Sequence, residues 1–295
     1  MKYIAFLCLF SSFSVWATDP SFCPVCPVPY LSHVLPLDVL PQLPWLNQDL
    51  IEIKKINYQK NTNASFCTRP PEMVDTIVIH HSESGANDTA TQMNQYHLDR
   101  YSYKVDSQGR FLRDAQGRKI KDPWYMVGYS YVVNSAYPNA TLPLPLVTEG
   151  RPLEIVGSHA GSTAFTKMDE EQQRIWDEGK VVCGKEGGPF KVDPKQSLNG
   201  TIKANISTIG VVVVGNYAVK SSSNPNGYPS TKPRIPTPQT IDMLARLACQ
   251  LQKKHPRMKT IKWHKFYHLT SCPGDLVDHV GQMKILAKGY GCEFN

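Results

Sequence analysis

Thr76-Ile-Val-Ile79, followed at once by His80-His81, is the stretch of this sequence that decides the fold. A short run of β-branched apolar residues is typical of a buried strand. A second run, over residues 211–214, consists of four valines that follow Gly210 and precede Gly215-Asn216. Four such residues in a row favour a central strand that is buried on both faces. We therefore expect these two segments to form the middle of one sheet, with a histidine pair at the end of the first strand.

Two helices and two more strands are expected around these runs. One helix is expected over about residues 89–100, and another begins at Thr237-Pro238, with Thr as N-cap and Pro as the first helical residue. Residues 129–133 are expected to form a strand with Tyr129, Tyr131 and Val133 on one face, and residues 261–263 a strand that ends at His264. This order predicts an α/β fold: a single domain with a central mixed β-sheet flanked by helices.

Composition divides the remainder of the chain into a leader, an arm and two insertions. Residues 1–17 have the positive start, apolar run and small-residue ending of a signal peptide, and the run is shorter than the roughly 20 residues that a membrane anchor needs. Residues 18–70 are expected to form a Pro-rich N-terminal arm, and residues 71–295 the folded domain. Surface insertions are expected near residues 101–122, as a hairpin, and near residues 162–206, with a charged helix over 168–178.

Charge and cysteine content favour an exported protein. Lysine and arginine outnumber aspartate and glutamate by 32 to 25, which favours acidic polymers or membrane surfaces as neighbours without choosing between them. Removal of the signal peptide takes away Cys8 and leaves an odd number of cysteines, so one of them needs a role other than a disulfide. Those remaining are Cys23, Cys26, Cys67, Cys183, Cys249, Cys272 and Cys292. Cys23-Pro-Val-Cys26 has no second pair to complete a zinc site, so we expect it to serve a disulfide.

Three residues that can bind a metal stand at or just after the ends of expected strands: His80, His264 and Cys272. Taken singly, each has an ordinary explanation as a surface or core histidine or as half of a disulfide. Taken together, they match a catalytic zinc, which needs three protein ligands and an open position for water. A zinc thiolate would also account for the odd cysteine. His81 competes with His80, because neighbouring residues of a strand point to opposite faces and only one can face the site.

Five blocks of sequence occur in a known order. They are Ile77-Val-Ile-His80-His81-Ser, Val127-Gly-Tyr129, Glu149-Gly-Arg151 with Val156-Gly-Ser-His159-Ala, Ser207-Thr-Ile-Gly210 with Val214-Gly-Asn216, and His264 with Thr270-Ser-Cys272-Pro-Gly. In this the chain resembles the zinc-dependent N-acetylmuramoyl-L-alanine amidase family (amidase type 2), which includes phage lysozyme-type amidases and peptidoglycan recognition proteins. The resemblance extends from about residue 74 to residue 283, interrupted by the two insertions.

The resemblance implies a zinc ion on His80, His264 and Cys272, and it selects His80 over His81 as the ligand. It implies no such role for His268, which we expect to be a surface residue or one that lies behind the ligands. His97 is expected to pack or form hydrogen bonds within its helix.

The resemblance also implies roles for three residues around the metal. Tyr129 corresponds to the family's catalytic tyrosine, whose hydroxyl can hold the attacking water or the developing oxyanion. Thr270 corresponds to a catalytic position that is Lys in the phage branch and Thr in the recognition proteins, and His159 to a position that often contacts substrate. Two departures are evident: Val212 stands about where some members have a glutamate, and Ser130 where a histidine is common. Tyr129 is therefore expected to contribute more of the catalysis.

The activity implied is that of an exported, periplasmic or secreted zinc hydrolase that cleaves the amide between N-acetylmuramic acid and the L-alanine of the stem peptide. Its partners would be peptidoglycan or muropeptides; we expect a monomer with no nucleic-acid partner and no membrane span. Two alternatives stay open. One is a non-catalytic peptidoglycan-binding recognition protein, a class that tends to lack the cysteine ligand kept here as Cys272. The other is an amidase that acts on a different amide.

Overall fold

The computed structural model describes residues 51–85, 88–104, 110–134, 146–161, 164–186, 188, 197–218 and 236–295. The signal peptide, the Pro-rich segment up to residue 50 and Cys23-Pro-Val-Cys26 lie outside these residues, so the expectations about them stay predictions. Within the described ranges, no helix combines the length and the apolar character that a membrane crossing requires.

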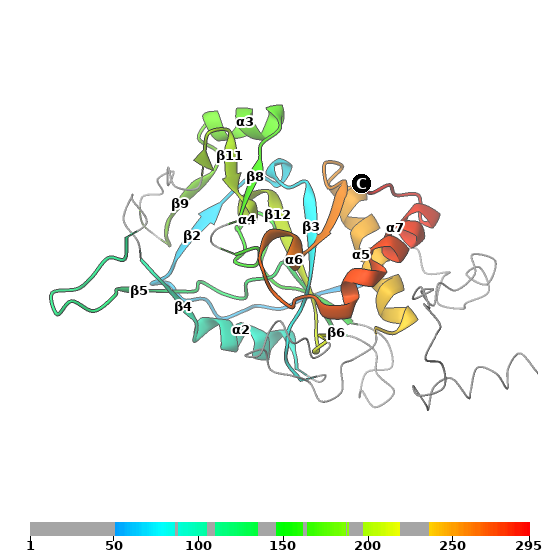
Figure 1. Cartoon of the computed structure of the whole chain (residues 1–295), viewed down its shortest axis with the longest axis horizontal. Coiled ribbons are helices and arrows are strands. Elements are labelled where there is room, and N and C mark those ends of the chain that lie inside the picture. Colours follow the sequence, from blue (N-terminus) through cyan, green and yellow to red (C-terminus); the bar gives the residue numbers. More distant parts are fainter. Residues whose placement is uncertain are drawn as a thin grey trace, which may run out of the picture. The chain divides into compact units, whose positions relative to one another are not determined.

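A six-stranded sheet in the order β1-β7-β6-β12-β3-β13 forms the centre of the described structure (Figure 1). Strand β12 runs parallel to both β3 and β6, β13 runs parallel to β3, and β6 and β7 are antiparallel, so the sheet is mixed, as predicted. Every residue of β12 and β3 is buried, which explains their continuous apolar runs. The strands are β1 (Ile53–Lys55), β3 (Thr76–His81), β6 (Tyr131–Asn134), β7 (Leu146–Glu149), β12 (Thr208–Val213) and β13 (Thr260–Trp263).

Helices cover both faces of this sheet. Helices α5 (Pro238–Lys254) and α7 (Val280–Gly289) pack together on one side of β3 and β12, and α2 (Ala90–Leu98) lies on the other (Figure 1). The two predicted N-termini are confirmed. Thr89 and Gln92 form a capping box at the start of α2, and the Thr237 hydroxyl accepts a hydrogen bond from the backbone N of Thr240 at the start of α5. Three short elements complete this part: η3 (Pro71–Met73), α6 (His264–Tyr267) and η5 (Gly274–His279).

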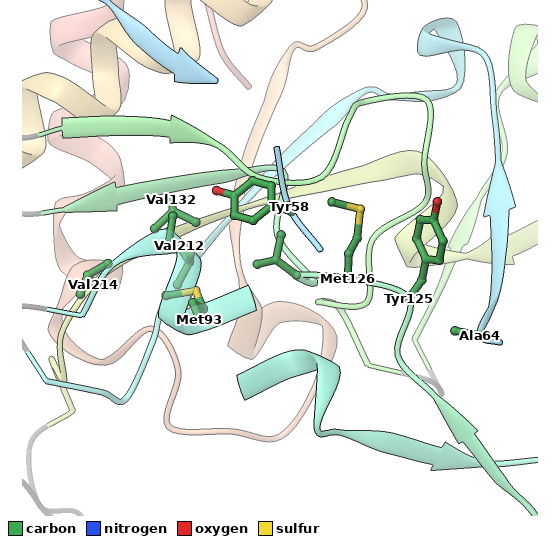
Figure 2. Packing of buried hydrophobic residues seen from close by; sticks show 10 residues of the cluster. Tyr58, Ala64, Met93, Tyr125, Met126, Val132, Val212 and Val214 are labelled. Atoms are coloured by element: carbon green, nitrogen blue, oxygen red, sulfur yellow. The ribbon is translucent and has the colours of Figure 1, made fainter. Parts of the chain in front are cut away.

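The face toward α2 contains an apolar cluster in which Met93 of α2 lies beside Val212 of β12 and Val132 of β6 (Figure 2). Tyr129 packs against this cluster. The expected sharing of one face by Tyr129, Tyr131 and Val133 is therefore wrong, because Tyr131 and Val133 flank Val132 and point to the opposite face. The reason is that β6 begins only at Tyr131, and Tyr129 precedes the regular alternation of the strand.

The first insertion is a hairpin, as predicted: β4 (Tyr101–Tyr103) pairs antiparallel with β5 (Lys121–Pro123). The second contains the predicted charged helix as α3 (Glu170–Asp177) and a small sheet of β8 (Phe165–Lys167), β10 (Ser197–Leu198) and β11 (Thr201–Lys203). The C-terminal end of this second insertion is buried, whereas a surface position was predicted for it. Ile202 and Ile206 are fully buried in a cluster with Met73 and Ile175, and α4 (Ala204–Ser207) leads directly into β12.

Residues from the segment expected to be an arm belong to the folded body. Strand β1 is an edge of the main sheet, and β2 (Ser65–Thr68) pairs with β9 (Val182–Lys185) of the second insertion. The Cys67–Cys183 disulfide joins β2 to β9, and Cys249–Cys292 joins α5 to the segment after α7. Among the described residues Cys272 is the free cysteine, in agreement with the expectation that one cysteine has another role.

The Cys249–Cys292 bridge closes 43 residues of chain, so its loss enlarges the conformational freedom of the unfolded state. Replacing both cysteines by alanine is expected to lower the free energy of unfolding by about 2–4 kcal/mol. Urea unfolding followed by circular dichroism measures this change against the wild-type protein, with both proteins under non-reducing conditions so that Cys67–Cys183 stays intact in each. An unchanged unfolding midpoint would show that helix packing alone holds the C-terminal segment.

Candidate metal centre

His80, His264 and Cys272 converge on one point at the carboxyl ends of two neighbouring strands. Trp263 pairs with Ile79 in the parallel ladder of β13 and β3, so His264 directly follows β13 beside His80. Cys272 reaches the same point from the loop before η5. One ligand atom from each residue lies within 4.8 Å of the others. The grouping predicted from the sequence is therefore present.

The state of these side chains fits a zinc ion. His80 Nδ1 lies 3.6 Å from Cys272 Sγ, and Nε2 of His264 is buried without a hydrogen-bond partner among the described residues. Burial lowers the pKa of His264 to about 4 and that of His80 well below its usual value, so both imidazoles are neutral. Burial also raises the pKa of the Cys272 thiol, which would release its proton on binding metal. Two neutral imidazoles and one thiolate are ligands that zinc prefers.

His81 lies on the opposite side of β3 and is not part of this group. Its Nδ1 accepts a hydrogen bond from the backbone N of Tyr217 at 3.0 Å. The prediction that only one of the two histidines faces the cluster is confirmed. The backbone of His81 still contributes, because its N–H donates to Cys272 Sγ at 3.4 Å.

Tyr129 lies beside the cluster, with its ring centroid 5.0 Å from that of His80. Burial is the main cause that raises the pKa of its hydroxyl, so the group is a neutral hydrogen-bond donor at pH 7. His97 supports the segment from behind, since its Nδ1 accepts from the backbone N of Gly128 at 3.0 Å. His97 thus has a structural role, as expected from the sequence.

Thr270 and Gly274 shape the loop that presents Cys272. The Thr270 hydroxyl oxygen accepts from the backbone N of Cys272 at 3.2 Å, which leaves the hydroxyl proton available to donate. Gly274 has a φ of 64°, and a Cβ there would lie 2.2 Å from the backbone oxygen of Tyr217. Only glycine fits this close approach. His268, at the surface, stacks near His264 at 6.1 Å between ring centroids, outside the ligand group.

His159 occupies a place that differs from the expected contact with substrate. It is only 5% exposed, and its Nδ1 lies 3.1 Å from Nε2 of His80. Its Nε2 lies 3.2 Å from the hydroxyl oxygen of Thr208. Both ring nitrogens therefore face protein partners rather than an open groove. The sequence indicated this residue but not its neighbours, because His159 lies in a loop whereas His80 and Thr208 belong to β3 and β12, which are distant from it in the chain.

Glu83 is a carboxylate near the site that the sequence reasoning missed. It has a φ of 54°, rare outside glycine, and its Oε1 accepts from the Ser271 hydroxyl at 3.1 Å. The His81 ring, whose Nε2 lies 3.4 Å from Oε1, and Ser271 hold the pKa of Glu83 below its usual value. Glu83, Asp88, Tyr96, Arg100 and Tyr129 line a pocket of about 430 Å³. The one feature of the sequence that could have indicated Glu83 is its position three residues after His80.

Two buried arginines, to which the sequence pattern assigned no role, hold backbone segments near the site. The Arg151 guanidinium donates to the backbone oxygens of Met126, Val127 and Val156. Arg69 donates to those of Leu153, Asn205, Ile206 and Thr208. Burial lowers the pKa of Arg69 to about 9 and that of Arg151 to about 10, so both stay charged at pH 7. They bind together the segments that precede Tyr129 and flank His159.

Comparison with known proteins gives one family. Residues 69–275 match the family model described as N-acetylmuramoyl-L-alanine amidase. No match was found among the curated proteins. Similar solved structures include the amidase LysC from Clostridium intestinale URNW, at 18% identity over 79% of this chain and 95% of that one, with a TM-score of 0.41. Wild-type Drosophila PGRP-LB is 14% identical over 78% of this chain and 93% of that one, with a TM-score of 0.40.

Proposed function

We propose, on the basis that this chain belongs to the N-acetylmuramoyl-L-alanine amidase family, that it is a zinc-dependent peptidoglycan hydrolase. The bond cleaved is the amide between N-acetylmuramic acid and the L-alanine of the stem peptide. The observation that supports this most is the convergence of His80, His264 and Cys272 within 4.8 Å at one edge of the sheet. These residues are the proposed zinc ligands.

The side chains around the ligands suit amide hydrolysis. When bound, zinc lowers the pKa of its water to about 7 and polarises the scissile carbonyl. The neutral hydroxyl of Tyr129, whose ring packs beside His80, can donate a hydrogen bond to the carbonyl oxygen as that oxygen becomes negative. The Thr270 hydroxyl, with its oxygen fixed by the backbone N of Cys272, is the second donor in this proposal.

Glu83 is our candidate for the group that accepts a proton from the attacking water. Val212 leaves the central strand without a carboxylate at that point, and it is part of the apolar cluster instead. Glu83 is ionised and lines the same pocket as Tyr129. An ionised carboxylate in a pocket with a phenol supplies one acceptor and one donor, which hydrolysis needs in turn.

We also propose that the protein acts outside the cytoplasm. The Cys67–Cys183 and Cys249–Cys292 disulfides support this, because such bridges persist in oxidising compartments. The signal-peptide pattern of residues 1–17 supports it independently. Outside the cytoplasm, cell-wall polymers would be available to it as substrate.

A sacculus digestion tests the enzyme against a receptor on the same fold. Purified sacculi incubated with the mature protein are expected to release stem peptides with L-alanine at the amino end, as measured by mass spectrometry. A chelator should reduce release to background and added zinc should restore it, since the ligands alone cannot activate water. Binding to sacculi without release would favour the non-catalytic receptor. Released fragments that lack amino-terminal L-alanine would show that a different bond is cleaved.

A further inference from the structure

We propose that His159 is a positioning residue that, together with Thr208, fixes which ring nitrogen of His80 carries a proton. The consequence is that His80 Nδ1 presents a bare lone pair to the metal. This inference rests on the proposed function only in taking His80 as a zinc ligand. It follows from four groups in a row: the backbone oxygen of Ala204, the Thr208 hydroxyl, His159 and His80.

The assignment begins at the Thr208 hydroxyl, which donates to the backbone oxygen of Ala204 at 2.7 Å. A hydroxyl has a single proton to donate, so toward His159 this oxygen can only accept. The backbone oxygen of Thr208, 3.4 Å from the same His159 nitrogen, is also an acceptor. His159 Nε2, facing two acceptors, is therefore the nitrogen that carries the proton.

The proton on Nε2 determines the other half of the His159 ring. A neutral imidazole has one N–H, so His159 Nδ1 is an acceptor. It faces His80 Nε2 at 3.1 Å, and a hydrogen bond between two nitrogens requires one donor. His80 Nε2 must supply it. The remaining nitrogen of His80, Nδ1, then has no proton and lies 3.6 Å from Cys272 Sγ.

The opposite tautomer of His159 does not fit these contacts. With its proton on Nδ1, His159 would donate to His80 Nε2 and put the His80 proton on Nδ1, where the metal has to bind. Its bare Nε2 would then face two acceptors, the hydroxyl oxygen and the backbone oxygen of Thr208.

The surrounding backbone holds the His159 ring in place. A Cβ at Gly210 would lie 2.8 Å from His159 Cγ, and a Cβ at Gly157 would lie 2.9 Å from Cδ2, so the ring fits only because both residues are glycine. The side-chain oxygen of Asn205 accepts from the backbone N of His159 at 3.0 Å and of Ala160 at 2.8 Å. The ring is thus oriented before any metal binds.

The test compares His159→Leu with His159→Asn. Leucine removes the acceptor, whereas the asparagine oxygen can accept from His80 Nε2 near the position of the lost Nδ1. Groups of this kind typically contribute 10–100-fold to metal affinity. We expect zinc to bind about 10–100-fold more weakly to His159→Leu, in competition with a chromophoric chelator, and His159→Asn to recover most of the affinity.

A second readout needs neither zinc nor turnover. Nitrogen-15 NMR of the imidazoles in the zinc-free wild-type protein should show His80 protonated on Nε2, and in His159→Leu a mixture of both tautomers. Thr208→Val, which removes only the hydroxyl, should shift the His159 signals, whereas Thr208→Ser should not. Thermal unfolding of the zinc-free variants controls for a loss of fold.

Two results would overturn the inference: His80 protonated on Nδ1 in the zinc-free wild-type protein, or a His159→Leu variant that is folded and binds zinc as tightly as wild type. Failure of the proposed function would look different. In that case the NMR pattern of the zinc-free protein would be as expected, but sacculi would release no peptide.

Discussion

Cys272→Ala is expected to release no stem peptide above background from purified sacculi. The variant lacks the only negative ligand of the proposed zinc site, so both metal retention and the activation of water should fail. Zinc content measured after dialysis should fall from near one ion per chain to background. Two independent readouts, metal content and peptide release, then respond to the same substitution.

The fold should survive this change, which makes the result interpretable. Cys272 is not in a disulfide, and its loop is held by other contacts: the backbone N of Lys265 donates to the Cys272 oxygen at 3.1 Å, and that of Asp275 to the Tyr217 oxygen at 2.9 Å. A loss of about 1 kcal/mol in the free energy of unfolding is expected. Cys272→Ser is the matched control of nearly equal size, and it should also be inactive. Full activity in either variant would show that the metal assignment is incorrect.

Arg151→Met is expected to lower the free energy of unfolding by about 3 kcal/mol or more. The substitution leaves the backbone oxygens of Met126, Val127 and Val156 without a donor in a buried site. Each such orphaned group costs about 1–3 kcal/mol. Denaturant unfolding measures the loss. Activity should fall as well, because the segment that Arg151 secures leads into Tyr129.

Arg174→Met on α3 is the control for Arg151→Met. The Arg174 side chain is 50% exposed and pairs with Glu171 and Glu178 at the surface. Exposed pairs contribute little to stability, so the free energy of unfolding is expected to stay at the wild-type value within experimental error. If Arg151→Met also changed stability by less than 1 kcal/mol, water would have to satisfy the three carbonyl groups.

The parts of the fold that follow from local pattern were predictable from the sequence. The valines of β12 specify a strand buried on both faces, and Thr237-Pro238 specifies the start of α5. The metal cluster could also be predicted, since His80 and His264 lie at the ends of two expected strands. Because parallel neighbouring strands end at the same edge, their last residues meet.

Other features could not be predicted because they depend on contacts between distant segments. His159 forms a hydrogen bond with His80, which lies 79 positions earlier in the chain. The His159 ring occupies space that is free only because Gly210 has no Cβ, and no sequence periodicity indicates this. The partners of Arg69 and Arg151 are backbone oxygens, which every residue has, so their identity leaves no mark in the sequence. Ile202 and Ile206 lie in a stretch of polar composition, which hid the small core of the second insertion.

Gly210 sets strand propensity against the packing at the edge of the sheet. Valine follows it three times in β12 and is a better strand former than glycine, so propensity alone would favour valine there. A Cβ at this position would meet both His159 and the Tyr129 ring, at 2.8 Å and 3.0 Å. A substitution that follows strand propensity would thus destabilise the packing and displace both rings, although Gly210 itself touches neither metal nor substrate.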